Sequence, residues 1–133
     1  MYREIEHKAD VAYEIIASSV EEVFRDIVSI IKDNTHYLVE ESSEHNKNLH
    51  NKLEKCYNII NDDTGEYDDN KLFDAVNDMI SLVDRGYYPF ETDGCCVRYY
   101  KSKIYTELKA LTYYNLKIET KDNQIHIRMV FDV

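Results

Sequence analysis

Acidic side chains are the most numerous groups in this chain that could do chemistry, and one run of them suggests a calcium loop. The run extends from Asp62 to Asp69 and contains Gly65. A helix–loop–helix calcium site needs its glycine at the sixth loop position and a closing glutamate at the twelfth. Here the glycine comes too early and no glutamate stands at the closing position. We therefore interpret the run as a solvated loop that leads into a helix.

Three cysteines could act as nucleophiles, zinc ligands or disulfide partners. Cys95 and Cys96 are adjacent and Cys56 stands alone, so the chain has no CxxC zinc pair and a poor disulfide framework. Nothing around them resembles a cysteine-hydrolase signature. We predict strand cysteines in a protein of the reducing cytosol.

Two carboxylates and two histidines near the ends of the chain are further candidates. Asp10 ends a polar interval, 7–10, between two predicted strands, and by residue type alone it is expected to be a turn residue that bonds its own backbone. Asp132 is expected to be a solvated strand end. By residue type alone, His7 is expected to be a half-buried strand histidine. His126 shares a strand face with Asp132 and is expected at the surface.

The net charge of −10, from 26 acidic and 16 basic residues, narrows the classes of partner. Lys and Arg supply most of the affinity for nucleic acid, so direct RNA or DNA binding is not expected. Anionic membranes are disfavoured in the same way, and no apolar stretch of about 18 residues occurs. The charge favours cations and basic proteins. The 12 tyrosines could stack on bases, but at this charge they are expected to pack the sheet or face a protein partner.

Apolar periodicity predicts the elements that must position these groups. Short strands are expected at 3–5 and 12–17. A helix begins at Ser18 or Ser19, each followed three residues later by glutamate, which is the capping-box spacing. Its apolar face continues to about Lys32.

A second amphipathic helix is predicted after the acidic run. Asp69 or Asn70 can cap its start, and Gly86 suits its end. Before it, the polar stretch 39–55 gives no clear prediction, whereas Cys56–Ile60 favours a strand. The apolar face of this helix consists of Leu72, Phe73, Val76, Met79, Ile80 and Val83.

The last third of the chain is predicted to be β. Strands are expected at 95–100 and 104–111, followed by a hairpin that turns at Asp122 and Asn123. After that turn apolar and polar residues alternate strictly from Ile125 to Asp132. The order of elements predicts a single α+β domain over residues 1–133, with two amphipathic helices packed on a largely antiparallel or mixed sheet.

Three segments together resemble the archease family. The opening EHKADV of Glu6–Val11, with SVEEVF at Ser19–Phe24, is similar to the family's E-H-T-A-D-[IV] motif and its helix start. ELKALTYYNLKIE at Glu107–Glu119 resembles the family's K-A-[IV]-T-Y strand. VFDV at Val130–Val133 resembles its closing aspartate plus aliphatic residue. The stretch before Glu107 is too short for the family's G-E-x-x-D segment.

The resemblance implies a metal site made by Asp10, Asp132 and the main-chain oxygen of Val133, with His7 orienting Asp10 or binding a partner. His126, on the same strand face as Asp132, is a further candidate for a supporting or partner-binding group. Such hard oxygen ligands suit Ca²⁺ or Mg²⁺. No acid–base or nucleophilic constellation accompanies them, which disfavours an independent metal-dependent enzyme.

The resemblance also implies a function. Archeases are cytoplasmic accessory proteins that promote guanylylation of a tRNA-splicing RNA ligase and so permit multiple turnovers, without being enzymes themselves. The alternative associated with the family is a chaperone-like modulator of an RNA methyltransferase.

Overall fold

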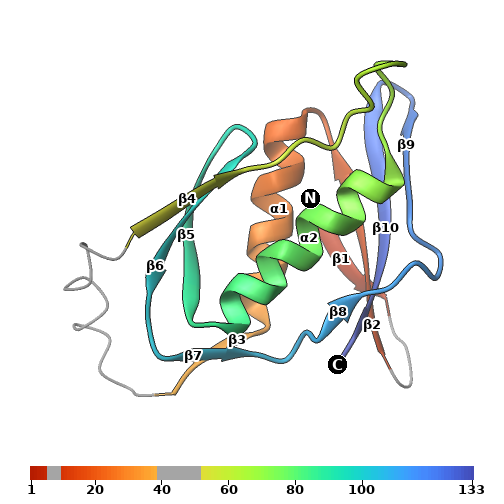
Figure 1. Ribbon diagram of the computed structural model, residues 1–133. Coiled ribbons are helices and arrows are strands. Elements are labelled where there is room, and N and C mark those ends of the chain that lie inside the picture. Colours follow the sequence, from red (N-terminus) through yellow and green to blue (C-terminus); the bar gives the residue numbers. More distant parts are fainter. Residues whose placement is uncertain (6–9, 39–51) are drawn as a thin grey trace.

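The computed structural model describes residues 1–5, 10–38 and 52–133 (Figure 1). Two helices, α1 (Val20–Asp33) and α2 (Asp69–Asp84), accompany short antiparallel strands. The strands are β1 (Tyr2–Ile5), β2 (Asp10–Ala17), β3 (Thr35–Tyr37), β4 (Lys52–Cys56), β5 (Tyr87–Asp93), β6 (Cys96–Lys101), β7 (Ile104–Thr106), β8 (Ala110–Leu111), β9 (Lys117–Lys121) and β10 (Gln124–Asp132). The predicted α+β class is confirmed.

The larger sheet is built around β10. Its strand order is β1-β2-β10-β8, and β9 also pairs with β10. The predicted hairpin is confirmed, because Asp122 and Asn123 both adopt positive φ (54° and 61°) between β9 and β10. The alternation along β10 is also confirmed except at Val130. That residue is buried on the face predicted to be polar, beside the buried Ala12 of β2, and its carbonyl accepts bonds from Thr112.

The two helices lie between the larger sheet and a three-stranded sheet of order β4-β6-β5 (Figure 1). Helix α1 contacts β2 and β5, whereas α2 contacts β5, β7 and β8. One hydrophobic cluster joins the layers, with Phe24 of α1, Met79 of α2, Tyr99 of β6 and Phe131 of β10 all fully buried. The helices therefore hold both sheets in place from a shared core.

Helix capping follows the sequence at α1 and departs from it at α2. The Ser19 hydroxyl accepts from the Glu22 N–H at 3.2 Å, as the capping-box spacing predicted. At α2 the cap is Asp68, not Asp69 or Asn70, because its carboxylate accepts from the N–H groups of Asn70 and Lys71. The Asp69 carboxylate instead accepts from the Ile118 N–H at 3.0 Å and so ties the start of α2 to β9.

The strand predicted at Cys56–Ile60 was misplaced. Strand β4 covers Lys52–Cys56, and only an isolated bridge from Ile60 to Tyr67 follows it. The Asn58 side chain accepts from the Ile60 N–H at 2.9 Å, a local turn that competes with strand pairing.

The prediction of a single strand at 104–111 was wrong, because this segment forms two strands that belong to different sheets. Strand β7 pairs with β3, and β8 pairs with β10. Between them the Thr106 hydroxyl accepts from the Leu108 N–H, and the Glu107 N–H donates to the Asn34 carbonyl at the end of α1. This turn redirects the chain and buries Leu108.

The cysteines form a disulfide that the sequence spacing did not indicate. Cys56 and Cys96 are bonded, with their Cα atoms 3.9 Å apart, and Cys95 is free. The prediction of a poor disulfide framework was wrong for this pair because β4 and β6 place the two residues directly opposite each other. Cys95 lies in the turn before β6, and burial raises the pKa of its thiol.

Candidate functional site

Asp10 and Asp132, far apart in sequence, are direct neighbours in the sheet. Asp10 is the first residue of β2, Asp132 is the last of β10, and the two are register partners. Directly opposed residues of an antiparallel pair project their side chains from the same face, with Cβ atoms about 4.5–5.5 Å apart. Asp10 is thus a strand residue and not a turn residue, and the two carboxylates occupy one corner of the sheet.

The position of Asp132 is fixed by the strand on its other side. Asp132 is also the register partner of Ala110 in β8, and its carbonyl accepts from the Lys109 N–H at 2.8 Å. Strand β8 is in turn held by Asn77 of α2, whose side chain accepts from the Leu111 N–H at 2.7 Å and donates to the Leu111 carbonyl at 3.2 Å. Helix α2 therefore fixes the end of β10 indirectly: the Asn77 side chain bonds the main chain of β8, and β8 pairs with β10.

This corner brings two like charges together, and a cation bound there would interact favourably with both. Two carboxylates at directly opposed positions destabilise a sheet unless something compensates them. Val133 follows Asp132 and is 44% exposed. Two carboxylates and an adjacent main-chain oxygen form an all-oxygen ligand set, which suits Ca²⁺ or Mg²⁺. On this ground the residues present fit a hard divalent cation.

The two predicted histidines lie elsewhere. His7 falls outside the described residues. His126 lies six residues before Asp132 on β10, about 20 Å away along an extended strand, so the structure does not bring it to the carboxylate pair. It borders a hollow of about 490 Å³ on the outer face, also lined by Glu14 and Arg128. Its Nε2 atom is buried without a hydrogen-bond partner among the described residues.

Comparison with known proteins identifies the family. A sequence model of the archease protein family matches residues 2–133. The chain belongs to the archease family. Protein archease of Thermotoga maritima is 30% identical over 138 residues, which cover 99% of each chain. The crystal structure of an archease and possible chaperone from Thermotoga maritima matches 100% of this chain and 98% of its own, with a TM-score of 0.65 and 30% identity.

Two further observations bear on what the sequence suggested about this archease. The acidic run forms turns: the Asn61 side chain accepts from the N–H groups of Asp63 and Thr64, as the loop interpretation predicted. Neither α1 nor α2, the helices of the described part, combines the length and apolar character that crossing a membrane requires.

Asn77 is the site-supporting residue that sequence reasoning missed. It lies on the polar face of α2, which the hydrophobic pattern assigns to solvent. No spacing rule reports a helix side chain that bonds the backbone of a two-residue strand. The only sequence signal is its amide group, which carries both a donor and an acceptor.

Proposed function

We propose that this archease is a metal-binding accessory protein that activates a tRNA-splicing RNA ligase, promoting its guanylylation and its multiple turnover. The observation that carries the proposal is the register pairing of Asp10 with Asp132. The family resemblance implies that these two residues are the metal-site aspartates. Val133 follows at the same corner and would supply a main-chain oxygen.

The residues of this corner have distinct roles in the proposal. The carboxylates of Asp10 and Asp132 would hold a Ca²⁺- or Mg²⁺-type ion. Asn77 and strand β8 keep the end of β10 in register, so Asp132 is presented in one geometry. When bound, the cation would neutralise the carboxylates and offer a Lewis-acid centre to phosphate oxygens.

Exposed aromatic side chains in the segment after β8 suit a protein partner. Tyr113 and Tyr114 follow β8 after one intervening residue, Thr112, and are 59% and 65% exposed. The Tyr113 ring stacks on Phe73 of α2, with centroids 3.8 Å apart, so it is held in place although it faces solvent. Tyrosines of this kind are enriched at protein interfaces. The net charge of −10 suits a basic partner whose own surface is built for RNA.

Ligation by the cognate ligase over many turnovers tests the proposal. We expect wild-type protein to stimulate product formation, and we expect Asp132→Asn, or deletion of Asp132 and Val133, to abolish stimulation while circular dichroism shows an intact fold. Arg128→Ala is the matched control, because Arg128 lies on the same strand face, is exposed, and has no ion pair among the described residues. Full stimulation by the folded, truncated protein would show that the site formed by Asp10, Asp132 and Val133 is not needed to activate the ligase.

The second candidate is a chaperone-like modulator of an RNA methyltransferase. The description of the solved relative as a possible chaperone favours it. A binding experiment with the purified RNA ligase and the purified RNA methyltransferase distinguishes the two candidate functions. Binding to the methyltransferase alone, with no effect on ligation, would favour the second.

A further inference from the structure

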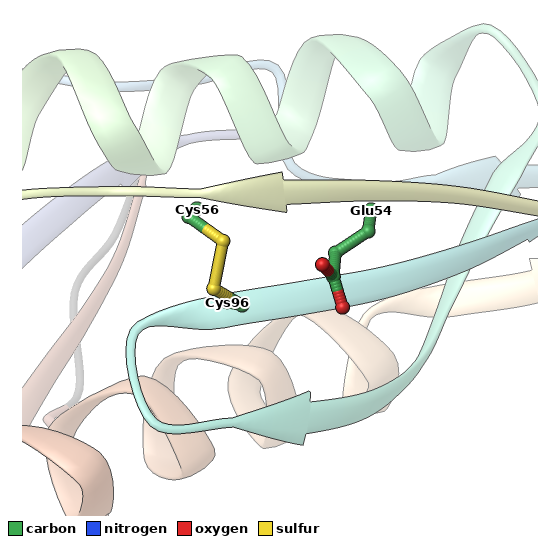
Figure 2. Close-up of side chains that lie close together, drawn as sticks. All are labelled: Glu54, Cys56 and Cys96. Carbon is green, nitrogen blue, oxygen red and sulfur yellow. A yellow bond between two sulfur atoms is a disulfide. The ribbon is translucent and has the colours of Figure 1, made fainter.

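A second cluster of potential metal ligands lies on the exposed face of the three-stranded sheet. Cys56 of β4 is the register partner of Cys96 of β6, and Glu54 lies two residues before Cys56 on the same face (Figure 2). The Tyr57 N–H donates to the Cys95 carbonyl at 3.0 Å. This bond makes Cys56 and Cys96 a non-hydrogen-bonded pair, the position at which opposed side chains come closest.

The ligand atoms of this cluster are close enough to share one ion. The two sulfur atoms and a carboxylate oxygen of Glu54 all lie within 4.8 Å of one another. Within residues 1–5, 10–38 and 52–133, no other group of three Cys, His, Asp or Glu side chains meets that condition. Two thiolates and a carboxylate, with water in the fourth position, form a tetrahedral set suited to zinc-class ions and unlike the oxygen set at the other corner.

The surrounding charges also favour a cation. Arg98 lies next to Cys96 along this face and pairs with three carboxylates, those of Glu54, Glu91 and Asp93. Asp93 of β5 is the register partner of Cys96 on the side away from Cys56. Lys52 lies on the same face of β4, so three carboxylates against two cationic side chains leave a net charge of −1 before the thiols ionise, which attracts a divalent cation.

The disulfide of this pair is open to chemical reduction. Cys56 is exposed and Cys96 is half-buried, so a reductant can reach the sulfur atoms. Exposed disulfides are in general the labile ones, whereas buried structural disulfides resist reduction. Strands β4 and β6 are register partners from Lys52–Tyr100 to Cys56–Cys96, so we expect this backbone pairing to keep the two thiols opposite each other after reduction.

We propose that Cys56, Cys96 and Glu54 form a redox-gated site for a thiophilic divalent cation of the zinc class. A phosphine and water reduce the disulfide to two thiols, and the phosphine becomes its oxide. Binding of Zn²⁺ then forms two sulfur–metal bonds and releases two protons to solvent. Hydrogen peroxide reverses the change: the two thiolates lose two electrons to form the disulfide, the peroxide takes up those electrons and two protons from solvent to become two waters, and the ion leaves. This site goes beyond the proposed function, and it shares no residue with the Asp10–Asp132 corner.

Titration of the full chain with Zn²⁺, in phosphine-reduced and in oxidised form, tests the proposal. We expect the reduced protein to bind Zn²⁺ and the oxidised protein to bind at least about 100-fold more weakly at this site, since both thiolate ligands are then unavailable. Co²⁺ as a probe should give a sulfur-to-metal charge-transfer band with the reduced protein only. That band reports thiolate ligation directly and needs no variant.

The chain offers matched controls for the variants. Cys56→Ser and Cys96→Ser should each abolish the band and weaken Zn²⁺ binding by about 100-fold or more, and Glu54→Gln should weaken it by about tenfold. Cys95→Ser should bind as wild type, because Cys95 packs against the hydrophobic core instead of lying in the cluster. Asp10→Asn should also bind Zn²⁺ normally, which separates this site from the proposed Ca²⁺ or Mg²⁺ site.

Two results would overturn the proposal. One is a reduced wild-type protein that is folded by circular dichroism but gives no charge-transfer band with Co²⁺. The other is equal Zn²⁺ affinity of the wild type and of Cys96→Ser, which would assign the bound ion to other residues.

Discussion

Replacing Asp132 by Asn should have opposite effects on stability with and without divalent metal. The substitution keeps the shape of the side chain and removes one of two negative charges that the register of β2 and β10 places opposite each other. Without metal, that removal relieves repulsion. With metal, it removes a ligand. Few other roles for Asp132 predict this change of sign.

The stability change without metal follows from the distance between the two charges, and the stability change with metal follows from mass action. Two unit charges about 4 Å apart interact by about 1 kcal/mol in water, so relief at the exposed Asp132 should raise the free energy of unfolding by less than about 1 kcal/mol. A ligand at 100 times its Kd stabilises the folded state by about 2.7 kcal/mol. For a chain of this size that corresponds to a rise in Tm of roughly 10 °C for the wild type and none for the variant.

Thermal unfolding followed by circular dichroism, in EDTA and in Ca²⁺, measures both effects. The matched control is Asp122→Asn, the same charge change in the turn at the other end of β10, where Asn is tolerated at positive φ. The control should keep the full Ca²⁺-induced shift. If Asp132→Asn also keeps that shift, Asp132 is not a ligand. If it is clearly less stable than wild type in EDTA, the carboxylate has a structural partner and the repulsion argument fails.

Three further perturbations have expected outcomes. Asn77→Ala should lower the free energy of unfolding, measured by urea denaturation, by about 1–3 kcal/mol. The substitution removes both side-chain bonds to Leu111 and leaves its backbone groups unpaired. A change below about 0.5 kcal/mol would show that other contacts hold β8 in place. Burial, and bonding to a second tyrosine and a carboxylate, raise the pKa of Tyr57, so its hydroxyl stabilises the fold at neutral pH and this contribution falls as the pH rises above about 10. Tyr57→Phe should flatten the alkaline end of the stability profile, and an unchanged profile would contradict that assignment. Reducing the bond between Cys56 and Cys96 in the presence of EDTA should cost about 2–4 kcal/mol, given the loop of 40 residues that it closes, and an unaltered Tm after reduction would mean that the bond adds no stability.

Elements with strong local signals were predicted well from the sequence. The α1 cap at Ser19 and the hairpin at Asp122 and Asn123 depend on residues within a few positions of one another. Local propensity and apolar periodicity are sufficient in such cases. The carboxylate corner needed the family resemblance, because nothing local at Asp10 shows which strand lies beside it.

The sequence did not predict features that arise from tertiary contacts of polar side chains. The polar face of α2 was expected to meet solvent, yet Asn77 bonds β8 and Asp78 bonds both Tyr57 and Lys55. The disulfide depends on the register of β4 with β6, which no spacing of cysteines encodes. The break between β7 and β8 depends on Thr106, whose turn-forming hydroxyl is indistinguishable by type from that of a strand threonine.

The pairing of β2 with β10 also has a kinetic consequence. It joins segments roughly 120 positions apart in sequence, so the entropy of closing a very long loop opposes its formation. The β9–β10 hairpin and the two helices rely on local contacts and can form earlier. Until β2 pairs with β10, the β10 edge that β2 occupies in the folded protein is unpaired. Association between incomplete chains is most favourable during that time. Asp10 and Asp132 should therefore come together late in folding. An ion that needs both carboxylates would bind only to chains in which β2 has already paired with β10.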